Sequence, residues 1–420
     1  MMGAAAAPLV VEKYGGTSVG DAARIRRIAE RAARLQRNGS PRVVVVSAMG
    51  HATDELLALA AGVSGDPFAH PRELDMLLTA GERISMALLA MAIEDAGGRA
   101  ISLTGSQAAI ITDDRHTGAR IREVRADRVR EELEAGRVVI VAGFQGVSVR
   151  QEVTTLGRGG SDTTAVALAA ALGAARCDIF TDVEGVFTAD PRRAPGARLL
   201  KRVSYDDMTE LAASGAQVLH PRAVEVGARF GIPVRVAAAD AESEEAGTLI
   251  AGSGSIEGLS LTGLASEAGY AQLVLRGMRE GPRTTARLLV ALADAGISVD
   301  MVAHADRPDG LRQIQVSVRE ASLDGALGVC QAALEASGGE RIDTRRDLAR
   351  VTLVGSGMHD RPGVYATAYD ALYAADIEVL GVSTSSVSIS LLVPADRRDE
   401  TLALLHAAFH LSALEAEGSA

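Results

Sequence analysis

The stretch VVEKYGGTSVGDAARI, residues 10–25, joins a short apolar run, a turn with two glycines and the start of a helical pattern. Lys13 ends the apolar run, Gly15 and Gly16 follow it, and Asp21 is placed to cap a helix. Paired glycines let backbone amides approach an anion, and a helix start adds partial positive charge. The spacing is neither GxxxxGK[ST] nor GxGxxG. It therefore predicts a phosphate cradle of another kind, or simply a tight turn with a solvated lysine.

The scarcity of lysine favours the first of these two interpretations. The chain has 43 basic residues, and only Lys13 and Lys201 among them are lysines. Lysine carries a compact point charge on a flexible stem, whereas arginine is planar and prefers bidentate partners. A lysine retained next to a glycine turn therefore points to a phosphate contact.

Outward from this stretch, the first 250 residues alternate short apolar runs with longer helical patterns. The runs are continuous, which is typical of parallel strands covered by helices on both faces, so an α/β layered domain is expected. The predicted strands are Leu9–Glu12, Arg42–Ser47, Ala100–Leu103, Val138–Ala142, Asp178–Thr181 and Pro233–Ala237. The predicted helices are Asp21–Gln36, Glu73–Ala96, Arg120–Ala135, Asp162–Leu172 and Tyr205–Ala213.

Composition narrows the class of protein. The 420 residues are 47% hydrophobic and carry a net charge of −11, so a broad basic face for nucleic acid is not expected. Cys177 and Cys330 do not suggest a disulfide framework. No apolar run reaches the roughly 18 residues of a membrane span, and the N-terminus does not resemble a signal peptide. A cytoplasmic location with no membrane partner is expected.

After residue 250 the pattern changes at a linker-like Gly-Ser stretch, residues 252–255. An internal repeat follows, with copies that begin at Ala271 and Ala349. Each copy predicts strand, loop, helix, strand, strand, helix, which is typical of a split βαβ module.

Two further segments carry polar residues at predicted turns. Residues 157–162, GRGGSD, open an apolar helix, with Ser161 available as a cap and Arg158 able to fork onto a carboxylate. Residues 181–192, TDVEGVFTADPR, begin where a strand ends, which is where open α/β sheets bind ligands. A helix cap explains Ser161 and Asp162 adequately, but it does not explain an arginine among three glycines, and a plain hairpin loop would look like residues 181–192. His116 and His220, like the other histidines, lack metal-ligand spacing, so they are assigned to loops or the surface, with no protein-held metal predicted.

These segments, in order with VVVVSAMGHATDELL, LLTAGERISMALLAMAI and GFQG, resemble the aspartate kinase family over nearly the whole chain. The resemblance implies an αβα sandwich of the amino-acid kinase type followed by two ferredoxin-like ACT modules. The corresponding boundaries are 1–250, 251–338 and 339–420. It also implies phosphorylation of the β-carboxylate of L-aspartate by ATP with Mg²⁺, towards lysine, threonine and methionine.

Site residues follow from the resemblance position by position. The catalytic residues it implies are Lys13, Arg158 and Asp162. Those for aspartate are Thr53, Glu82, Arg158 and Ser161. Those for the nucleotide are Lys13, Gly15, Gly16, Ser18, Thr181, Asp182, Phe187, Arg192 and Gln217. Those for an amino-acid effector, lysine or threonine, are Asp360, Pro362, Gly363, Val364, Ser383 and Thr384. Thr53 and Glu82 could instead be an N-cap residue and a solvated helix residue.

The chain departs from the family pattern at several places, including Gln217, the turn at residues 279–283, Ala303-His304 and Ser386. Gln217 stands where the family usually has lysine, which predicts weaker nucleotide binding, unless Arg222 compensates. Ser386 replaces the glutamate of the usual Ser-Thr-Ser-Glu, which removes a carboxylate partner for an effector's ammonium group. Weak or altered feedback is therefore expected, with a homo-oligomer formed through the ACT modules. Two alternatives stay open: a kinase of the same fold for another amino acid, and a catalytically impaired amino-acid sensor.

Overall fold

The computed structural model describes residues 7–241, 243, 245–252, 260–279, 283–356, 358 and 363–412. The chain divides into two compact units. The N-terminal unit comprises the chain up to Val186, Leu199–Ala213 and residues 217–256. The C-terminal unit comprises Phe187–Arg198, Ser214–Ala216 and the chain from residue 257 onward. Each unit has its own sheet.

An eight-stranded sheet forms the centre of the N-terminal unit, in the order β10-β12-β11-β9-β1-β2-β6-β3. Its strands are β1 Val10–Tyr14, β2 Arg42–Val46, β3 Ala100–Leu103, β6 Val138–Ala142, β9 Arg176–Thr181, β10 Arg202–Ser204, β11 Val234–Ala238 and β12 Thr248–Ala251. The six strands predicted from the sequence are the six that run parallel as neighbours, from β11 to β3. Every residue of β2 and of β6 is buried, as expected for a parallel sheet with two covered faces.

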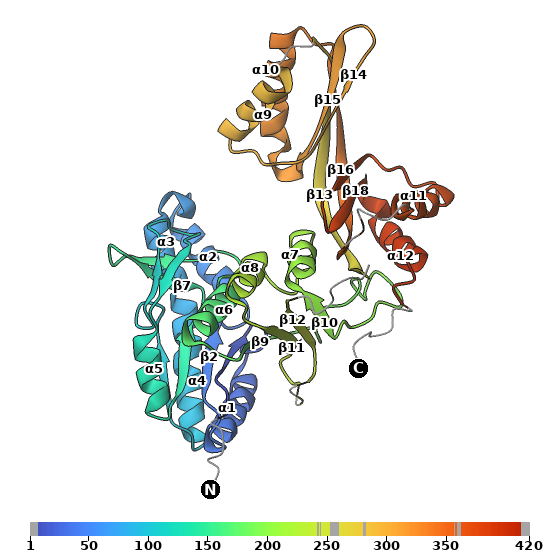
Figure 1. Cartoon of the computed structure of the whole chain (residues 1–420). Coiled ribbons are helices and arrows are strands. Elements are labelled where there is room, and N and C mark those ends of the chain that lie inside the picture. The colour runs from blue at the N-terminus through green and yellow to red at the C-terminus, as the bar shows by residue number, and fades with distance from the viewer. Residues whose placement is uncertain are drawn as a thin grey trace. The chain divides into compact units, whose positions relative to one another are not determined.

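Helices cover both faces of this sheet (Figure 1). On one face α1 (Ala22–Arg37) and α4 (Ala80–Asp95) share a hydrophobic cluster with Tyr14 of β1. Because neighbouring residues of a strand point to opposite faces, Lys13 projects towards the other face, which α6 (Gly160–Leu172) covers. The remaining helices of the unit are α2 Ala52–Val63, α3 Pro71–Leu78, α5 Asp127–Glu134, α7 Tyr205–Ala213 and α8 Pro221–Phe230.

Two helix predictions need correction. The pattern read as one helix over Arg120–Ala135 contains strand β5 (Ile121–Val124) before α5 begins at Asp127. Pairing outweighs local helix propensity here, because β5 lies in a second sheet of order β5-β4-β7-β8. The other strands of that sheet are β4 Ile110–Thr112, β7 Gln145–Ser148 and β8 Val153–Thr155. The pattern over Glu73–Ala96 is divided at Thr79 into α3 and α4.

The helical stretch Pro71–Asp95 is long and apolar enough to cross a membrane by length and composition, because an 18-residue window within it has a mean hydropathy of 1.5. Charged residues such as Glu82 and Arg83 interrupt the stretch, so it is not an apolar run of that length. The same stretch packs on the sheet through Leu89 and Ile93, which are fully buried. Only 39% of that window is buried, and Ile84, Leu88 and Met91 are exposed, so core packing accounts for only part of this apolar composition.

The C-terminal unit holds a six-stranded sheet in the order β14-β15-β13-β16-β18-β17. Its first repeat runs β13 Ser260–Arg279, α9 Thr284–Asp294, β14 Val299–Asp306, β15 Leu311–Arg319 and α10 Leu323–Ser337. Its second runs β16 Arg341–Ser356, α11 Val364–Ala374, β17 Gly381–Thr384, β18 Ser388–Pro394 and α12 Arg398–Ala408. The repeat order inferred from the sequence is confirmed.

The long strands β13 and β16 pair along both repeats. The second half of β13 packs in the core of the first repeat, through Leu273 and Leu275. Its first half packs in the core of the second repeat, through Leu264. The core of the second repeat therefore includes the first half of β13, which precedes the first repeat's helix in the chain. The module boundary at 338/339 stays a prediction, and the two hydrophobic cores are not divided at that position.

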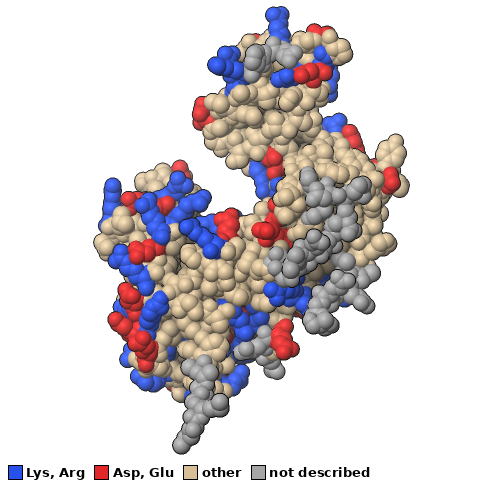
Figure 2. Space-filling view, viewed as in Figure 1, with Lys and Arg blue, Asp and Glu red and all other residues tan. Residues whose placement is uncertain are grey.

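On the face shown in Figure 2, acidic and basic side chains are mixed rather than gathered by sign.

Candidate active site

Lys13 and Asp162 meet at the carboxyl edge of the main sheet. Lys13 Nζ lies 2.6 Å from Asp162 Oδ1, and the two side chains are only 12% and 13% exposed. Asp162 lies in the first turn of α6, where the helix dipole stabilises a carboxylate. The lysine singled out by its scarcity is therefore held in place, while Lys201 is exposed.

The glycine turn after β1 packs tightly against the end of β2. A Cβ on Gly16 would lie 2.8 Å from the carbonyl oxygen of Ala48, so only glycine allows this approach. Gly50 N donates to Gly16 O at 3.0 Å and fixes the two turns together. Ser18 Oγ is buried and lacks a hydrogen-bond partner among the described residues. A backbone cradle with an unused hydroxyl fits a bound phosphate.

Glu82, in the first turn of α4, is 3% exposed and is not a solvated helix residue. Its Oε1 accepts a hydrogen bond from Ala48 N at 3.1 Å. Its Oε2 is buried and has no partner in the part of the chain that the structure describes. Burial raises the pKa of this carboxyl to about 7, against the smaller lowering effect of backbone donors. A ligand that brings a positive charge to Oε2 would be stabilised here.

Thr53 lies inside α2, half-buried, and the N-cap of that helix is His51. The N-cap interpretation of Thr53 is therefore wrong.

The turn at residues 157–159 carries Arg158, which is exposed. Gly157 and Gly159 have φ angles of 75° and 65°, so the turn depends on glycine. Gly159, not Ser161, is the N-cap of α6, and Ser161 is buried inside the helix. The predicted capping role of Ser161 is wrong because Gly159 in the left-handed conformation starts the helix two residues earlier.

His220 lies in the loop before α8, as expected, and it is partly buried because it packs against this turn. A Cβ on Gly159 would lie 2.2 Å from the Cβ of His220, which shows how closely the His220 side chain approaches the Gly159 backbone. His220 Nδ1 accepts from Arg222 N at 3.3 Å and caps α8. Burial and then the charge of Arg222 hold the pKa of His220 below its ordinary value.

The guanidinium of Arg222 is engaged with backbone carbonyl oxygens and does not replace the lysine charge that is missing at Gln217. Its guanidinium donates to the carbonyl oxygens of Leu156 at 2.6 Å and Ala119 at 3.0 Å. It therefore supports the segment before the glycine turn. Gln217 itself is exposed, between α7 and α8.

Asp75 of α3 is a functional candidate that the sequence analysis missed. It is fully buried and accepts hydrogen bonds from His116 Nδ1 at 2.7 Å and Thr155 Oγ1 at 2.6 Å. Thr117 N donates to both of its oxygens, at 3.1 and 3.2 Å. These bonds fasten residues 116–117 beside the turn that carries Arg158, because a Cβ on Gly157 would lie 3.3 Å from Thr117 O. The only sequence signal was an acidic residue inside an otherwise apolar helix face.

The nucleotide candidates divide between the two units. Thr181 is the last residue of β9 at the carboxyl edge and Asp182 follows it, and Thr181 Oγ1 donates to Asp182 Oδ1 at 3.1 Å. Phe187 and Arg192 belong to the C-terminal unit, where Arg192 Nε donates to Asp190 Oδ1 at 3.0 Å.

Among the effector candidates, Asp360 and Pro362 lie outside the described residues. Gly363, with φ 107°, caps α11, and Val364 begins it. Ser383 and Thr384 are exposed on β17. Across the described ranges, no three His, Cys, Asp or Glu side chains come together as a metal cluster.

Comparisons with known proteins agree with this arrangement. The model of the amino acid kinase family matches residues 8–238, and an ACT domain model matches residues 351–409. An aspartokinase of Corynebacterium efficiens is 46% identical over 409 residues, which are 96% of each chain. E. coli aspartokinase III, solved with aspartate and ADP, is 26% identical with a TM-score of 0.77, covering 96% of this chain and 100% of that one. The same enzyme solved with lysine and aspartate is 27% identical with a TM-score of 0.73, covering 95% and 99%.

Proposed function

The chain belongs to the amino acid kinase family and, within it, to the aspartokinases, and from this premise we propose that it transfers the γ-phosphoryl group of ATP to the β-carboxylate of L-aspartate. The observation that carries the proposal is the pairing of Lys13 with Asp162 beside the glycine turn. The products are ADP and 4-phospho-L-aspartate, for the lysine, threonine and methionine branches of amino-acid biosynthesis. The reaction takes place in the cytoplasm.

The transfer needs positioning and charge neutralisation rather than a base. An oxygen of the β-carboxylate attacks the γ-phosphorus, and the bond from that phosphorus to the bridging oxygen of ADP breaks. The carboxylate is already ionised at pH 7, so no proton has to leave it. Lys13 offsets the negative charge on the transferring group, and the amides of Gly15 and Gly16 with the Ser18 hydroxyl contact the phosphates.

Asp162 keeps Lys13 oriented through the 2.6 Å ion pair. Mg²⁺, bound to the nucleotide, supplies further charge neutralisation at the phosphates. The carboxylate of Asp162 is a hard oxygen ligand of the kind that Mg²⁺ prefers, and it lies beside the phosphate turn, so the residues fit a nucleotide-bound ion. Thr181 and Asp182 are the nucleotide-site residues of the N-terminal unit in this proposal, whereas Phe187 and Arg192, in the C-terminal unit, stay candidates from the family resemblance.

Aspartate binds through its charged groups. Its ammonium group meets Glu82 Oε2, the buried oxygen that lacks a described partner. Arg158 clamps a carboxylate of the substrate, and Thr53 and Ser161 contribute hydroxyls. The ammonium charge favours ionised Glu82, so the binding of aspartate is coupled to the loss of a proton from the Glu82 carboxyl group.

The ACT modules take an amino-acid effector and join copies of the chain into a homo-oligomer. E. coli aspartokinase III binds lysine, which supports lysine as one effector to test. The exposed Ser383 and Thr384 of β17, and Ser386 after it, offer hydroxyls rather than a carboxylate to an ammonium group. Feedback by lysine or threonine is therefore weak or altered.

The test is hydroxylamine trapping of the acyl phosphate made from ATP and aspartate. Lys13→Ala should lower kcat about 100-fold, because loss of one charge-stabilising group commonly costs about 3 kcal/mol of barrier. Lys201→Ala is the matched control, since it removes the other lysine, and should leave kcat unchanged. Equal loss in both variants would contradict the role of Lys13. Trapping with glutamate or N-acetylglutamate but not with aspartate would favour another acceptor, and no trapping at all would favour an amino-acid sensor.

A further inference from the structure

The glycine turn that carries Arg158 packs against a neighbouring segment of the N-terminal unit. Ala119 N donates to Thr155 O at 2.8 Å, and a Cβ on Gly157 would lie 3.3 Å from Thr117 O. All of these residues belong to the N-terminal unit. The position of the turn therefore depends on how this neighbouring segment is held.

Arg222, in the first turn of α8, joins the neighbouring segment to the chain just before the turn. Its Nη1 donates to Leu156 O at 2.6 Å, and its Nη2 donates to Ala119 O at 3.0 Å. Leu156 directly precedes Gly157. A planar guanidinium holds two acceptors in fixed directions at once, which a flexible ammonium group does not. The fork of Arg222 therefore fixes the spacing between the two segments.

The backbone of Arg222 is linked to the other end of the same turn. Arg222 N donates to His220 Nδ1 at 3.3 Å, and the His220 ring packs on Gly159. Gly159 is the N-cap of α6, and Arg158 is the exposed residue before it. The start of α8 thus contacts the chain both before and after Arg158.

The charge of Arg222 has no acidic counterpart. The side chain is half-buried, and it forms no ion pair with a carboxylate within the described ranges. Burial, and then the charge of Arg120, lower the pKa of Arg222. The two carbonyl oxygens are therefore the groups that compensate the guanidinium for its lost hydration.

We propose that Arg222 is a positioning residue for L-aspartate, because its forked guanidinium holds the turn that presents Arg158 to a carboxylate of the substrate. The proposal rests on the proposed function, in which Arg158 clamps that carboxylate. Loss of the fork lets the turn move, so aspartate binding weakens. Arg222 forms no hydrogen bond or ion pair with Lys13 or with the phosphate turn in the part of the chain that the structure describes. Nucleotide binding therefore stays intact.

The experiment compares substitutions at two arginines of α8. Arg222→Met keeps the length of the side chain and removes its donors, whereas Arg222→Lys keeps the charge but not the planar fork. Arg229→Met is the matched control, because Arg229 is exposed near the other end of the same helix. KM for aspartate, KM for ATP and the thermal midpoint are measured for each variant of the full chain.

Arg222→Met should raise KM for aspartate about tenfold, because two backbone acceptors lose a charged donor, with KM for ATP within about twofold of wild type. Arg222→Lys should raise KM for aspartate at least about threefold, and it decides the matter if Arg222→Met fails to fold. Arg229→Met should match wild type.

Three results would overturn the proposal. A KM for ATP that rises as much as KM for aspartate, or more, would show that Arg222 serves the nucleotide in place of the lysine missing at Gln217. A lower thermal midpoint with both KM values unchanged would leave Arg222 only a role in stability. A wild-type KM for aspartate in Arg222→Lys would show that charge suffices without the fork.

Calorimetric titration with aspartate in the presence of ADP separates this proposal from the proposed function. A wild-type protein that binds aspartate but makes no acyl phosphate refutes the phosphoryl transfer alone, and the Kd for aspartate still ranks the variants. Wild-type affinity for aspartate in both Arg222 variants refutes the positioning role alone. A wild-type protein that binds no aspartate refutes both.

Discussion

Asp75 in α3 and Glu82 in α4 are buried to a similar degree, but their surroundings differ. Both oxygens of Asp75 accept hydrogen bonds, from two side chains and a backbone amide. Glu82 accepts one from Ala48 N, and Oε2 has no described partner. A buried carboxylate whose two oxygens both accept hydrogen bonds stabilises the fold. A buried carboxylate oxygen without a donor lowers the stability of the fold until a ligand supplies a partner. The difference distinguishes the group that shapes the site from the group that binds.

The largest expected effect is that of Glu82→Gln on aspartate. The amide keeps the shape but loses the charge that pairs with the substrate ammonium, so kcat/KM for aspartate should fall about 100-fold, as expected for a buried charge-assisted bond of ~2.7 kcal/mol. KM for ATP should stay within about twofold. Steady-state kinetics at saturating ATP measure this, and an unchanged kcat/KM would refute the assignment of Glu82 to the ammonium group.

The same variant should be more stable than wild type when no ligand is bound. The pKa of Glu82 rises from 4.5 to about 7 on folding, so the folded protein holds the extra proton between those values, and stability falls as pH rises through them. At pH 8 the carboxylate then costs about 3 kcal/mol, a cost that Glu82→Gln removes and that is absent below pH 4.5. Urea unfolding of wild type and variant at pH 8 and near pH 5 checks this sign.

Asp75→Asn makes the identical chemical change with the opposite expected result. An amide nitrogen cannot accept from His116 or Thr117, so a buried donor loses its partner and the free energy of unfolding should fall by about 2 kcal/mol. KM for aspartate should rise only severalfold, through displacement of the turn that carries Arg158. If urea unfolding shows no loss, or if aspartate kinetics suffer as much as in Glu82→Gln, the contrast between the two carboxylates fails.

The smallest effect is expected at Gln217, which is exposed and neutral. Gln217→Lys adds a charge near the nucleotide in a solvated place, worth about 0.5 kcal/mol, so KM for ATP should fall about twofold to threefold. Gln217→Met, of similar length and without charge, is the control and should not lower it. A KM for ATP that is unchanged or higher in the lysine variant would show that Gln217 does not weaken nucleotide binding.

The sequence predicted the frame of the N-terminal unit well, since continuous apolar runs such as Val43–Val46 leave little choice but a buried parallel strand. It also identified Lys13, because a residue type that is nearly absent elsewhere stands out. The strand Ile121–Val124 was missed because its partner β4 supplies the pairing that local propensity does not reveal.

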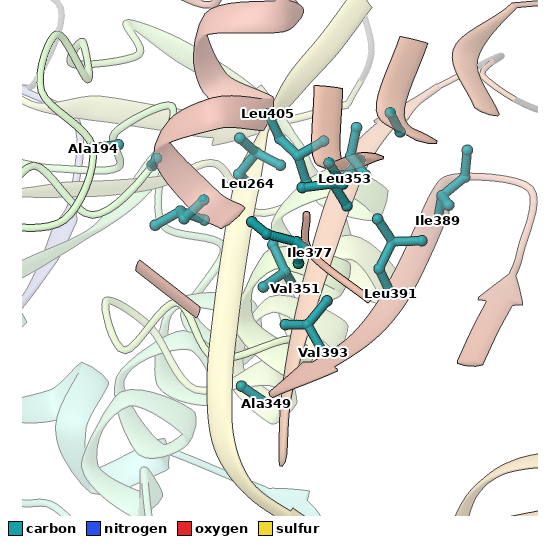
Figure 3. Packing of buried hydrophobic residues seen from close by; sticks show 14 of the residues in the cluster. Ala194, Leu264, Ala349, Val351, Leu353, Ile377, Ile389, Leu391, Val393 and Leu405 are labelled. Atoms are coloured by element: carbon teal, nitrogen blue, oxygen red, sulfur yellow. The ribbon is translucent and has the colours of Figure 1, made fainter. Parts of the chain in front are cut away.

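At the site, the sequence analysis mainly failed to predict contacts between residues that are far apart in the chain. Asp75 meets residues 41 and 80 positions away, and His220 packs on Gly159, so neither contact leaves a local pattern. The packing of Phe187–Arg198 in the C-terminal unit could not be predicted from the sequence either. The small residues Ala189 and Ala194 are typical of loops, and only their buried neighbours show that they belong to a core (Figure 3).

The packing of residues 187–198 in the C-terminal unit also limits how the coding sequence could be divided. A separately translated polypeptide that started near residue 257 would carry both repeats but would lack Ala189 and Ala194. Leu264 and His406 would lose their hydrogen bonds to Thr188. Gene fission at the linker would therefore leave a cavity in the hydrophobic core of the C-terminal unit. A binding partner or compensating substitutions would have to fill that cavity.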